Sequence, residues 1–318
     1  MIMKYPEVAI AICTYNRAYY LNKTIELLLS LNYPKKKYSI LIIDDCSSDN
    51  TYDVCNTLNK KNIVPIKYVR LSQHTNLAKA RNQALLQTKT SYLIFIDDDI
   101  HVNKNWLKKL IILAVKQPTI GLIGGGVIPR LDSRLTRPDW FTDKIIYGFA
   151  YSYIDWGKRR KMLRYPETLI TANCLLNLQV LKSNAYFNPL FGPSRDRSIV
   201  GEDIELNWRL MTKGIRILYD PSLTVYHTII KPKLTKSFVR LKHFYWGVTE
   251  SCLQNYFNKI DPFFPMLLHR LKKCCLLLKR LIVSLLRSKP LFDFESELWY
   301  HLGYLYGLIY KRKRFENK

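Results

Sequence analysis

The chain has 318 residues, of which 48% are hydrophobic, so it can bury a full core and is not an intrinsically disordered protein. Fifty Lys and Arg residues against 25 Asp and Glu give a formal charge of +25, which favours anionic partners such as nucleic acid, an acidic membrane surface or phosphorylated substrates. No apolar run reaches the roughly 18 to 20 residues of a membrane span, and no signal peptide or Cys-x-x-Cys pair is present, so we expect a cytosolic protein with reduced thiols.

The first hundred residues alternate between short apolar runs and segments with helical periodicity. Short apolar runs are typical of strands buried on both faces of a sheet. The strands predicted in this way are Val8–Ile12, Tyr38–Ile43, Ile66–Leu71 and Tyr92–Ile96. The helices predicted between them are Tyr19–Leu31, Thr51–Leu58 and Asn76–Gln87. This alternation predicts an α/β fold with a parallel sheet and crossover helices.

Polar residues follow three of these strands at the point where each strand ends. They are the segment Thr14 to Arg17, the pair Asp44 and Asp45, and the triplet Asp97 to Asp99. Ligands bind beyond the carboxyl ends of parallel strands, so this edge is the predicted site. Three adjacent carboxylates repel one another and call for a cation, and oxygen ligands suit Mg²⁺ or Mn²⁺. No dinucleotide fingerprint or P-loop follows the first strand.

The middle of the chain is less regular. A helix is predicted over Asn103–Val115, and a strand over Gly121–Ile128 whose three consecutive glycines permit close approach of a ligand, a bulge or tight packing. From Leu131 to Thr168 the pattern is irregular. Gly201 to Asp203 then open an amphipathic helix, and the helix dipole favours acidic residues there even without a function. Two further strands are predicted at Ile215–Tyr219 and Leu223–His227.

From Lys231 onward the chain is basic and apolar. A helix over Met266–Lys289 is predicted to have an apolar face made of Leu267, Leu271, Cys274, Leu278, Leu281 and Leu285. Its basic face is predicted to contain Arg270, Lys273, Arg280 and Arg287. Such a helix either lies on an anionic membrane surface or packs on the preceding domain, and the sequence leaves both open. The aromatic-rich segment Leu298–Tyr310 suits a membrane interface.

Five stretches in this order resemble the motifs of family 2 glycosyltransferases: VAIAICTYNR, LIIDDCSSDNT, NLAKARNQAL, LIFIDDDI and GEDIELNWRL. The resemblance covers roughly residues 5 to 230. It implies a GT-A fold, which is a Rossmann-like, mostly parallel central sheet flanked by helices. It also implies a transferase domain over residues 1–230, with a nucleotide-binding half of about 1–100 and an acceptor half of about 101–230. A basic, helical C-terminal region would occupy residues 231–318.

The resemblance also implies roles for individual residues. The residues implied in nucleotide-sugar binding are Thr14, Tyr15, Arg17, Asp44, Asp45, Arg81, Asp97 and Asp98. Tyr15 would stack on the base, and either Asp44 or Asp45 would accept a hydrogen bond from it. Arg81 would hold the nucleotide or its diphosphate, and Asp97 would approach the ribose. Asp98 would face the ribose or support the site.

The metal and the acceptor are assigned in the same way. Asp99 and His227 would bind a divalent metal, Mn²⁺ or Mg²⁺. Asp203 would be the general base that takes the acceptor proton, and Glu202 is the competing assignment. The residues implied in support of the acceptor side are Asn173, Trp208 and Arg209.

The predicted function is inverting transfer of a sugar from a nucleotide diphosphate sugar to an acceptor hydroxyl. The glycan or lipid-linked acceptor would belong to surface-glycan assembly or to protein or lipid glycosylation, and the protein would be cytoplasmic, with contact to the inner face of the cell membrane left open. An inactive glycosyltransferase-like scaffold is a second reading. A nucleic-acid-binding protein is a third, favoured by the charge of +25. The aspartate clusters and the lack of a nucleic-acid motif argue against it, so no nucleic-acid partner is expected.

Overall fold

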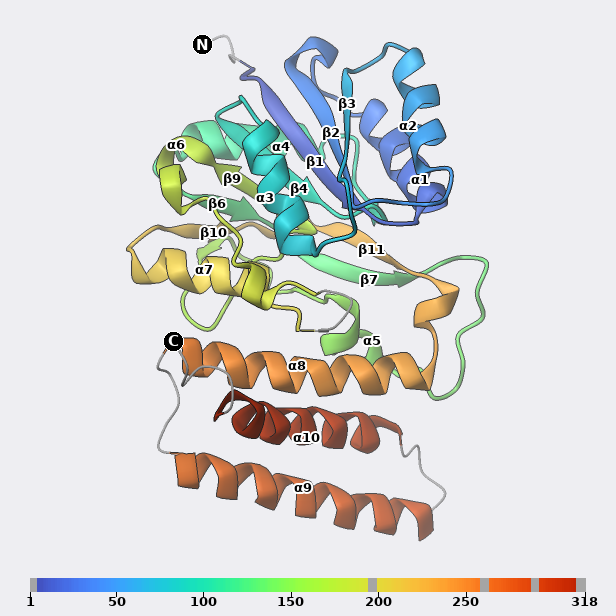
Figure 1. Ribbon diagram of the computed structural model, residues 1–318, viewed down its shortest axis with the longest axis vertical. Coiled ribbons are helices and arrows are strands. Elements are labelled where there is room, and N and C mark those ends of the chain that lie inside the picture. Colours follow the sequence, from blue (N-terminus) through green and yellow to red (C-terminus); the bar gives the residue numbers. More distant parts are fainter. Residues whose placement is uncertain (1–4, 194–198, 258–262, 287–291, 313–318) are drawn as a thin grey trace. The chain divides into compact units, whose positions relative to one another are not determined.

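The computed structural model describes residues 5–193, 199–257, 263–286 and 292–312. The strands, labelled as in Figure 1, are β1 (Val8–Thr14), β2 (Tyr38–Asp44), β3 (Ile66–Arg70), β4 (Tyr92–Ile96), β5 (Ile100–His101), β6 (Leu122–Gly124), β7 (Val127–Leu131), β8 (Lys161–Met162), β9 (Asn173–Asn177), β10 (Ile217–Tyr219) and β11 (Val225–Ile229).

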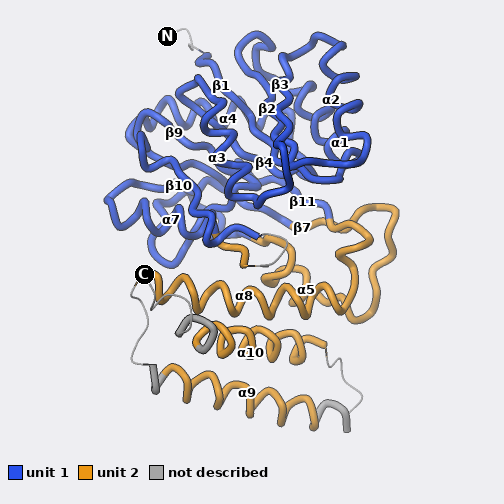
Figure 2. The backbone as a smooth tube through the Cα atoms, in the orientation of Figure 1, with its two compact units in different colours: residues 1–128, 154–195, 202–228 blue, residues 129–153, 196–201, 229–318 orange. Residues whose placement is uncertain are grey.

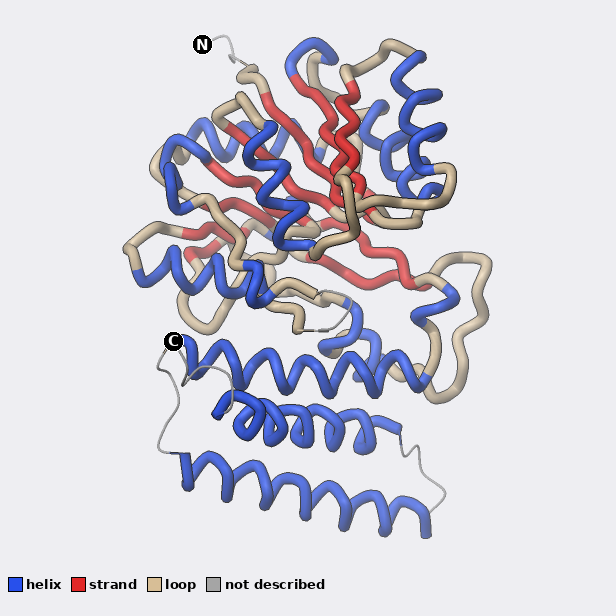
Figure 3. Tube along the Cα trace, in the orientation of Figure 1, coloured by secondary structure: helices blue, strands red, loops and turns tan. Residues whose placement is uncertain are grey.

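Helices and strands alternate along most of the chain, and the part after β11 is helical (Figure 3). The helices are α1 (Ala18–Leu29), α2 (Thr51–Lys60), α3 (Leu77–Gln87), α4 (Trp106–Lys116), α5 (Asp143–Ile146), α6 (Leu178–Leu181), α7 (Glu202–Thr212), α8 (Lys236–Tyr256), α9 (Phe263–Leu286) and α10 (Phe292–Arg312). Short 3-10 turns lie at Lys35–Lys37, Phe149–Tyr151, Lys182–Asn184, Pro189–Phe191, Pro221–Leu223 and Lys231–Lys233. Within the described ranges, none of the helices combines the length and the apolarity needed to cross a bilayer.

The structure divides into two compact units (Figure 2). Unit 1 consists of Met1–Ile128, Ile154–Arg195 and Glu202–Thr228, and unit 2 of Pro129–Tyr153, Asp196–Gly201 and Ile229–Lys318. The end of unit 1 lies close to the predicted boundary after residue 230. Unit 2 also takes in residues 129–153, which the sequence analysis assigned to the acceptor half.

The main sheet of unit 1 runs in the order β3-β2-β1-β4-β9-β6-β10-β8. Strands β3, β2, β1 and β4 are parallel, as the sequence predicts, while β9 runs antiparallel to both β4 and β6. A smaller sheet has the order β5-β11-β7. The parallel half brings the carboxyl ends of β1, β2 and β4 to one edge, where Thr14, Asp44 and Asp97 lie.

Both faces of the main sheet are buried, which explains the apolar runs without alternation in the sequence. On one face Ile10 and Ile12 of β1 join a core that includes residues of α1, α2 and α4. On the other face Ala9 and Ala11 join a core that includes residues of α3 and α7. The small alanines of β1 share this core with further alanines on α3, and small side chains allow a helix to lie close to a sheet.

The single strand predicted over Gly121–Ile128 is wrong, because the structure divides it into β6 and β7, which belong to different sheets. The break falls at Gly125 and Gly126. A Cβ atom on Gly125 would lie 2.6 Å from the carbonyl carbon of Leu223, and one on Gly126 would lie 2.8 Å from the hydroxyl oxygen of Thr224. Tight packing against this neighbouring turn therefore accounts for these two glycines.

Unit 2 contains the helices α8, α9 and α10. Helix α10 packs on both α8 and α9 (Figure 1). Within the apolar face predicted for α9, Leu271 and Leu278 are exposed and Cys274 is buried, and Leu277, which the prediction left out, is buried as well. Of the other residues in that prediction, the side chain of Leu285 and the whole of Arg287 lie outside the described part of the chain.

Candidate active site

Two aspartates and a histidine form a cluster at the carboxyl end of β4. Asp97 and Asp99 follow β4 directly, and β11 supplies His227, whose backbone pairs with Ile100 of β5. The three side chains bring ligand atoms within 4.8 Å of one another. The Nε2 atom of His227 lies 2.9 Å from Oδ1 of Asp99. Two carboxylates and one imidazole form an oxygen-rich donor set that suits Mn²⁺ or Mg²⁺.

Asp98 has its partners at and just after the end of β1. Its Oδ2 atom accepts a hydrogen bond of 2.7 Å from the Thr14 hydroxyl, and its Oδ1 atom lies 3.1 Å from Nη1 of Arg17. The other terminal nitrogen of Arg17 contacts Oδ2 of Asp99. Burial raises the pKa of Asp98 to about 6, although Arg17 and the Thr14 hydroxyl oppose the rise. Arg17 therefore balances the charge of two neighbouring aspartates.

Arg81 joins the aspartate cluster to the start of α7. This side chain comes from α3 and is 4% exposed. Its guanidinium contacts the carboxylate of Glu202 and lies 3.6 Å from Oδ1 of Asp97. Arg81, predicted to hold the nucleotide or diphosphate, thus bonds to carboxylates of two separate motifs. A buried cation with two anionic partners fixes the distance between them.

Asp203 is the second acidic residue of α7 and lies next to Glu202. Its Oδ2 atom accepts a hydrogen bond of 3.4 Å from the backbone N–H of Thr171, and its Oδ1 atom accepts one of 2.9 Å from the N–H of Ile204. Burial raises the pKa of Asp203 to about 7, the Glu202 carboxylate adds to the rise, and Arg81 opposes it. A carboxyl group that titrates near neutral pH is suited to accept a proton during catalysis.

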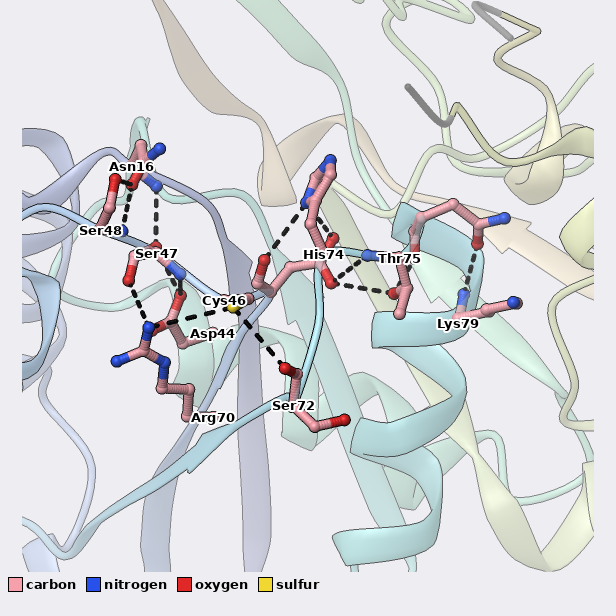
Figure 4. A network of polar contacts seen from close by, with 12 residues as sticks. Asn16, Asp44, Cys46, Ser47, Ser48, Arg70, Ser72, His74, Thr75 and Lys79 are labelled. Atoms are coloured by element: carbon pink, nitrogen blue, oxygen red, sulfur yellow. Dashed lines mark hydrogen bonds and ion pairs between the residues drawn. The ribbon is translucent and has the colours of Figure 1, made fainter. Parts of the chain in front are cut away.

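The two aspartates after β2 have different partners. Asp44 is 1% exposed and accepts hydrogen bonds from the backbone N–H and the hydroxyl of Ser47 and from the Tyr68 hydroxyl. Asp45 is 6% exposed, and its Oδ1 atom accepts two hydrogen bonds of 2.9 Å from the N–H and the hydroxyl of Thr75. Figure 4 shows the wider network, in which Ser47 lies near Asp44 and Arg70 while Thr75 lies beside His74. Both carboxylates are therefore held by the protein itself.

Tyr15 offers an exposed aromatic ring at the same edge. The side chain is 40% exposed, and its ring stacks on that of His74 with centroids 4.1 Å apart and an interplanar angle of 26°. The Nδ1 atom of His74 lies 3.0 Å from Oδ2 of Asp45. The structure thus brings the predicted base-stacking residue, one of the two predicted base-binding carboxylates and a histidine together.

The three predicted acceptor-side residues lie inside the protein framework. Asn173 is fully buried, and its side chain bonds to the Trp106 indole and to the backbone oxygens of Gly126 and Leu223. The indole of Trp208 donates to the Pro166 carbonyl at 3.3 Å and packs on the Tyr165 ring. Arg209 pairs with Glu205 at 2.8 Å and donates to two carbonyls of the 184–186 segment.

Two residues that the sequence analysis did not select take part in this arrangement. His74 follows the third strand, and the polar SQH segment at that strand end was the signal that could have identified it. Asn207 lies one helical turn after Asp203. Its side chain bonds to both backbone groups of Leu169 and to the carbonyl of Asp203, so it holds the segment whose Thr171 N–H contacts the Asp203 carboxylate.

Comparison with known proteins gives curated relatives from two staphylococci. Poly-beta-1,6-N-acetyl-D-glucosamine synthase of Staphylococcus epidermidis is 26% identical over 215 residues, which are 67% of this chain and 48% of the synthase. Poly(ribitol-phosphate) beta-N-acetylglucosaminyltransferase TarS of Staphylococcus aureus is 29% identical over 197 residues, which are 57% of this chain and 32% of TarS. The chain therefore spans about half or less of the length of these curated relatives.

The fold and the family are both established by comparison. The mannosyltransferase PcManGT from Pyrobaculum calidifontis, solved with GDP-Man and Mn²⁺, superposes with a TM-score of 0.58 at 14% identity, over 98% of this chain and 76% of that one. This likeness shows the GT-A fold predicted from the sequence. The sequence profile of glycosyl transferase family 2 matches residues 9–177, more than half of the chain. The chain belongs to glycosyl transferase family 2.

Proposed function

We propose that this chain is a metal-dependent, inverting glycosyltransferase that moves a sugar from a nucleotide diphosphate sugar to an acceptor hydroxyl. The observation that carries the proposal is the link made by Arg81 between the two groups of acidic residues. On one side of Arg81 lies Asp97, a member of the metal-type cluster, and on the other lies Glu202, the neighbour of Asp203. One buried cation thus joins the metal-type cluster to Glu202, the residue next to the proposed base.

The residues present fit a divalent ion. Asp97, Asp99 and His227 would hold Mn²⁺ or Mg²⁺, because they offer carboxylate oxygens and one imidazole nitrogen close together. Such an ion supplies Lewis-acid stabilisation of the charge that develops on a departing nucleotide diphosphate. Arg17 supports the cluster by balancing Asp98 and one oxygen of Asp99.

Asp203 is the residue that we propose as general base. Its raised pKa means that it binds the acceptor proton more strongly than an ordinary carboxylate does at neutral pH. Glu202, the alternative, has its carboxylate engaged in an ion pair with the buried guanidinium of Arg81. Thr171 and Ile204 orient the Asp203 carboxylate through their backbone N–H groups.

The donor and the acceptor are proposed from the relatives. The synthase and TarS are both named for N-acetylglucosamine, so a nucleotide diphosphate of that sugar is the first donor to test. The acceptor would be a glycan or lipid-linked glycan of the cell surface. Tyr15, with its exposed ring, would stack on the donor base.

An assay of nucleotide release tests the proposal directly. The full chain is incubated with a panel of nucleotide sugars and Mn²⁺, and the released nucleotide diphosphate is measured with and without EDTA. We expect one donor to be hydrolysed or transferred in a reaction that EDTA abolishes. Failure to turn over or bind any donor would contradict the proposed function.

We also propose that unit 2 contacts an anionic membrane surface on the cytoplasmic side. Within α9, Cys274 and Leu277 are buried, whereas a second apolar stripe lies exposed at Leu268, Leu271, Cys275, Leu278 and Ile282. The spacing of three and four residues puts this stripe on one side of the helix. Lys272, Lys273, Lys279 and Arg280 are exposed on the same helix, which carries no acidic residue. An exposed apolar stripe with cations beside it is typical of helices at an anionic lipid interface.

A further inference from the structure

We propose that His74 reads the base of the nucleotide donor, and that it selects a keto base with an imide N–H, uracil or guanine. The inference rests on the proposed function, because it concerns the nucleotide end of the same site. It assigns base selection to a residue other than the two carboxylates predicted for it. The argument depends on which hydrogen-bonding groups at this edge already have partners in the protein.

The two carboxylates have most of their acceptor positions filled. An ionised carboxylate offers about four positions for hydrogen-bond donors. Ser47 donates two hydrogen bonds to the Asp44 carboxylate, and the Tyr68 hydroxyl donates a third. Thr75 donates two hydrogen bonds to the Asp45 carboxylate, and the His74 ring lies against its other oxygen. With exposures of 1% and 6%, both carboxylates are held inside the protein rather than presented to a ligand.

Unlike the two carboxylates, the ring of His74 has one of its two nitrogens engaged with the protein. Its Nδ1 atom lies 3.0 Å from Oδ2 of Asp45 and 3.2 Å from the backbone oxygen of the same residue. Both of these oxygens are acceptors, so Nδ1 is the nitrogen that holds the hydrogen in the neutral ring. The Nε2 atom is then an acceptor with its lone pair in the plane of the ring. Across the described ranges of the chain, no residue hydrogen-bonds to Nε2.

An acceptor at this position matches some bases and rejects others. Uracil presents an N–H donor at N3 and guanine presents one at N1, and either could donate to Nε2. Cytosine N3 and adenine N1 are acceptors, so they would face Nε2 lone pair to lone pair. A base bonded in the plane of the His74 ring would lie on the side of Tyr15 where His74 already stacks. A site built around one hydrogen bond discriminates well against an analogue that lacks the partner group.

Two substitutions test the roles of the two ring nitrogens of His74 separately. The side-chain amide of His74→Asn reaches about as far as Nδ1, so it can still donate to Asp45 but leaves nothing at Nε2. The longer side chain of His74→Gln places an amide at the position of Nε2. His269→Phe, at an exposed position of α9, serves as the control.

The experiment is calorimetric titration of the full chain with UDP, 3-methyl-UDP, GDP, 1-methyl-GDP and CDP in the presence of Mn²⁺. We expect the wild type and His269→Phe to bind either UDP or GDP about tenfold more tightly than its N-methylated form and than CDP, since methylation removes one hydrogen bond to an otherwise unpaired group. The nucleotide that binds about tenfold more tightly than its own N-methylated form identifies the base. In His74→Asn the ratio should fall to about one, and His74→Gln should recover part of it.

An unchanged ratio in His74→Asn, or tighter binding of CDP by the wild type, would overturn the role of His74. Wild-type protein that binds none of these nucleotides would instead contradict the proposed function. If His74→Asn does not fold, as judged by its thermal melt, the comparison of methylated and unmethylated nucleotides in the wild type and in His74→Gln still decides the matter. Equal binding of UDP and 3-methyl-UDP, and of GDP and 1-methyl-GDP, by the wild type would then refute the proposal.

Discussion

Asp203 is the residue on which the proposed chemistry depends most. Replacing Asp203 with Asn keeps the side-chain shape but removes the ability to accept a proton. We predict a loss of transfer rate of about 10²- to 10⁴-fold, the usual contribution of a general base, with nucleotide affinity unchanged. Steady-state transfer kinetics and nucleotide titration measure the two effects. Loss of nucleotide binding in Asp203→Asn, or a transfer rate like that of the wild type, would remove Asp203 from this role.

The raised pKa of Asp203 makes a second prediction, which concerns pH. A base acts in its ionised form, so kcat/KM should rise with pH and reach half of its plateau near pH 7. The folded chain holds this proton more tightly than the unfolded chain, whose Asp pKa is 3.8. The unfolding free energy should therefore fall as pH rises from about 4 to about 7. The Asp203→Asn variant should lack this part of the slope in urea denaturation series, and an identical slope would count against the assignment.

At the residue scale, the strand ends allowed much of the site to be predicted. Asp97 and Asp99 follow an apolar run, and their position at a sheet edge follows from local pattern alone. His74 and the burial of Asn173 depend on contacts between distant segments. Nothing near residue 173 in the sequence indicates that its amide bonds to Trp106, Gly126 and Leu223.

At the element scale, glycines set how closely α8 and α10 pack. A Cβ atom on Gly303 of α10 would lie 1.8 Å from the carbonyl oxygen of Phe244 on α8. Alanine is normally the better helix former by about 1 kcal/mol, so an unconstrained Gly303→Ala change would stabilise the protein. We predict the opposite sign, a loss of about 1 to 3 kcal/mol of unfolding free energy, because one helix must shift. Urea denaturation measures it, with Leu302→Ala at an exposed position as the control.

A more stable Gly303→Ala variant would show that α8 and α10 do not pack as closely as the structure has them.

The elements themselves were predicted well where local pattern decides, as for β1 to β4 and for α1 to α3. The error at Gly121–Ile128 arose where tertiary packing decides, and packing also decides which residues of α9 are buried. Gly125 follows the end of β6 because of the turn that contains Leu223, and among the described side chains of α9 Cys274 and Leu277 are buried whereas Leu271 and Leu278 are exposed.

At the scale of the whole molecule, the charge of +25 and the exposed stripe of α9 predict binding to lipid. The full chain should bind vesicles that contain anionic phosphatidylglycerol and bind neutral phosphatidylcholine vesicles much more weakly, with an affinity that falls as salt is added. The double variant Leu271→Glu and Leu278→Glu should weaken binding at least tenfold, because burial of each leucine contributes about 1.5 to 3 kcal/mol. Vesicle co-sedimentation measures this.

The matched control for this experiment is Leu86→Glu, the same substitution at an exposed leucine of α3. It should leave vesicle binding almost unchanged. Equal loss in both variants would show that the stripe on α9 has no special role. Equal binding to neutral and anionic vesicles would show that the net charge has no role in vesicle binding.

The central claim is that Asp97, Asp99 and His227 hold the metal that the nucleotide diphosphate shares, and Mn²⁺ binding tests it most directly. Water-proton relaxation can be used to titrate Mn²⁺ into the full chain in the presence of a nucleotide diphosphate, with Asp53→Ala on the exposed side of α2 as the control. We predict one Mn²⁺ bound by the wild type and by Asp53→Ala, and at least about tenfold weaker binding in Asp99→Ala and in His227→Ala. Mn²⁺ affinity in Asp99→Ala equal to that of the wild type would contradict the claim.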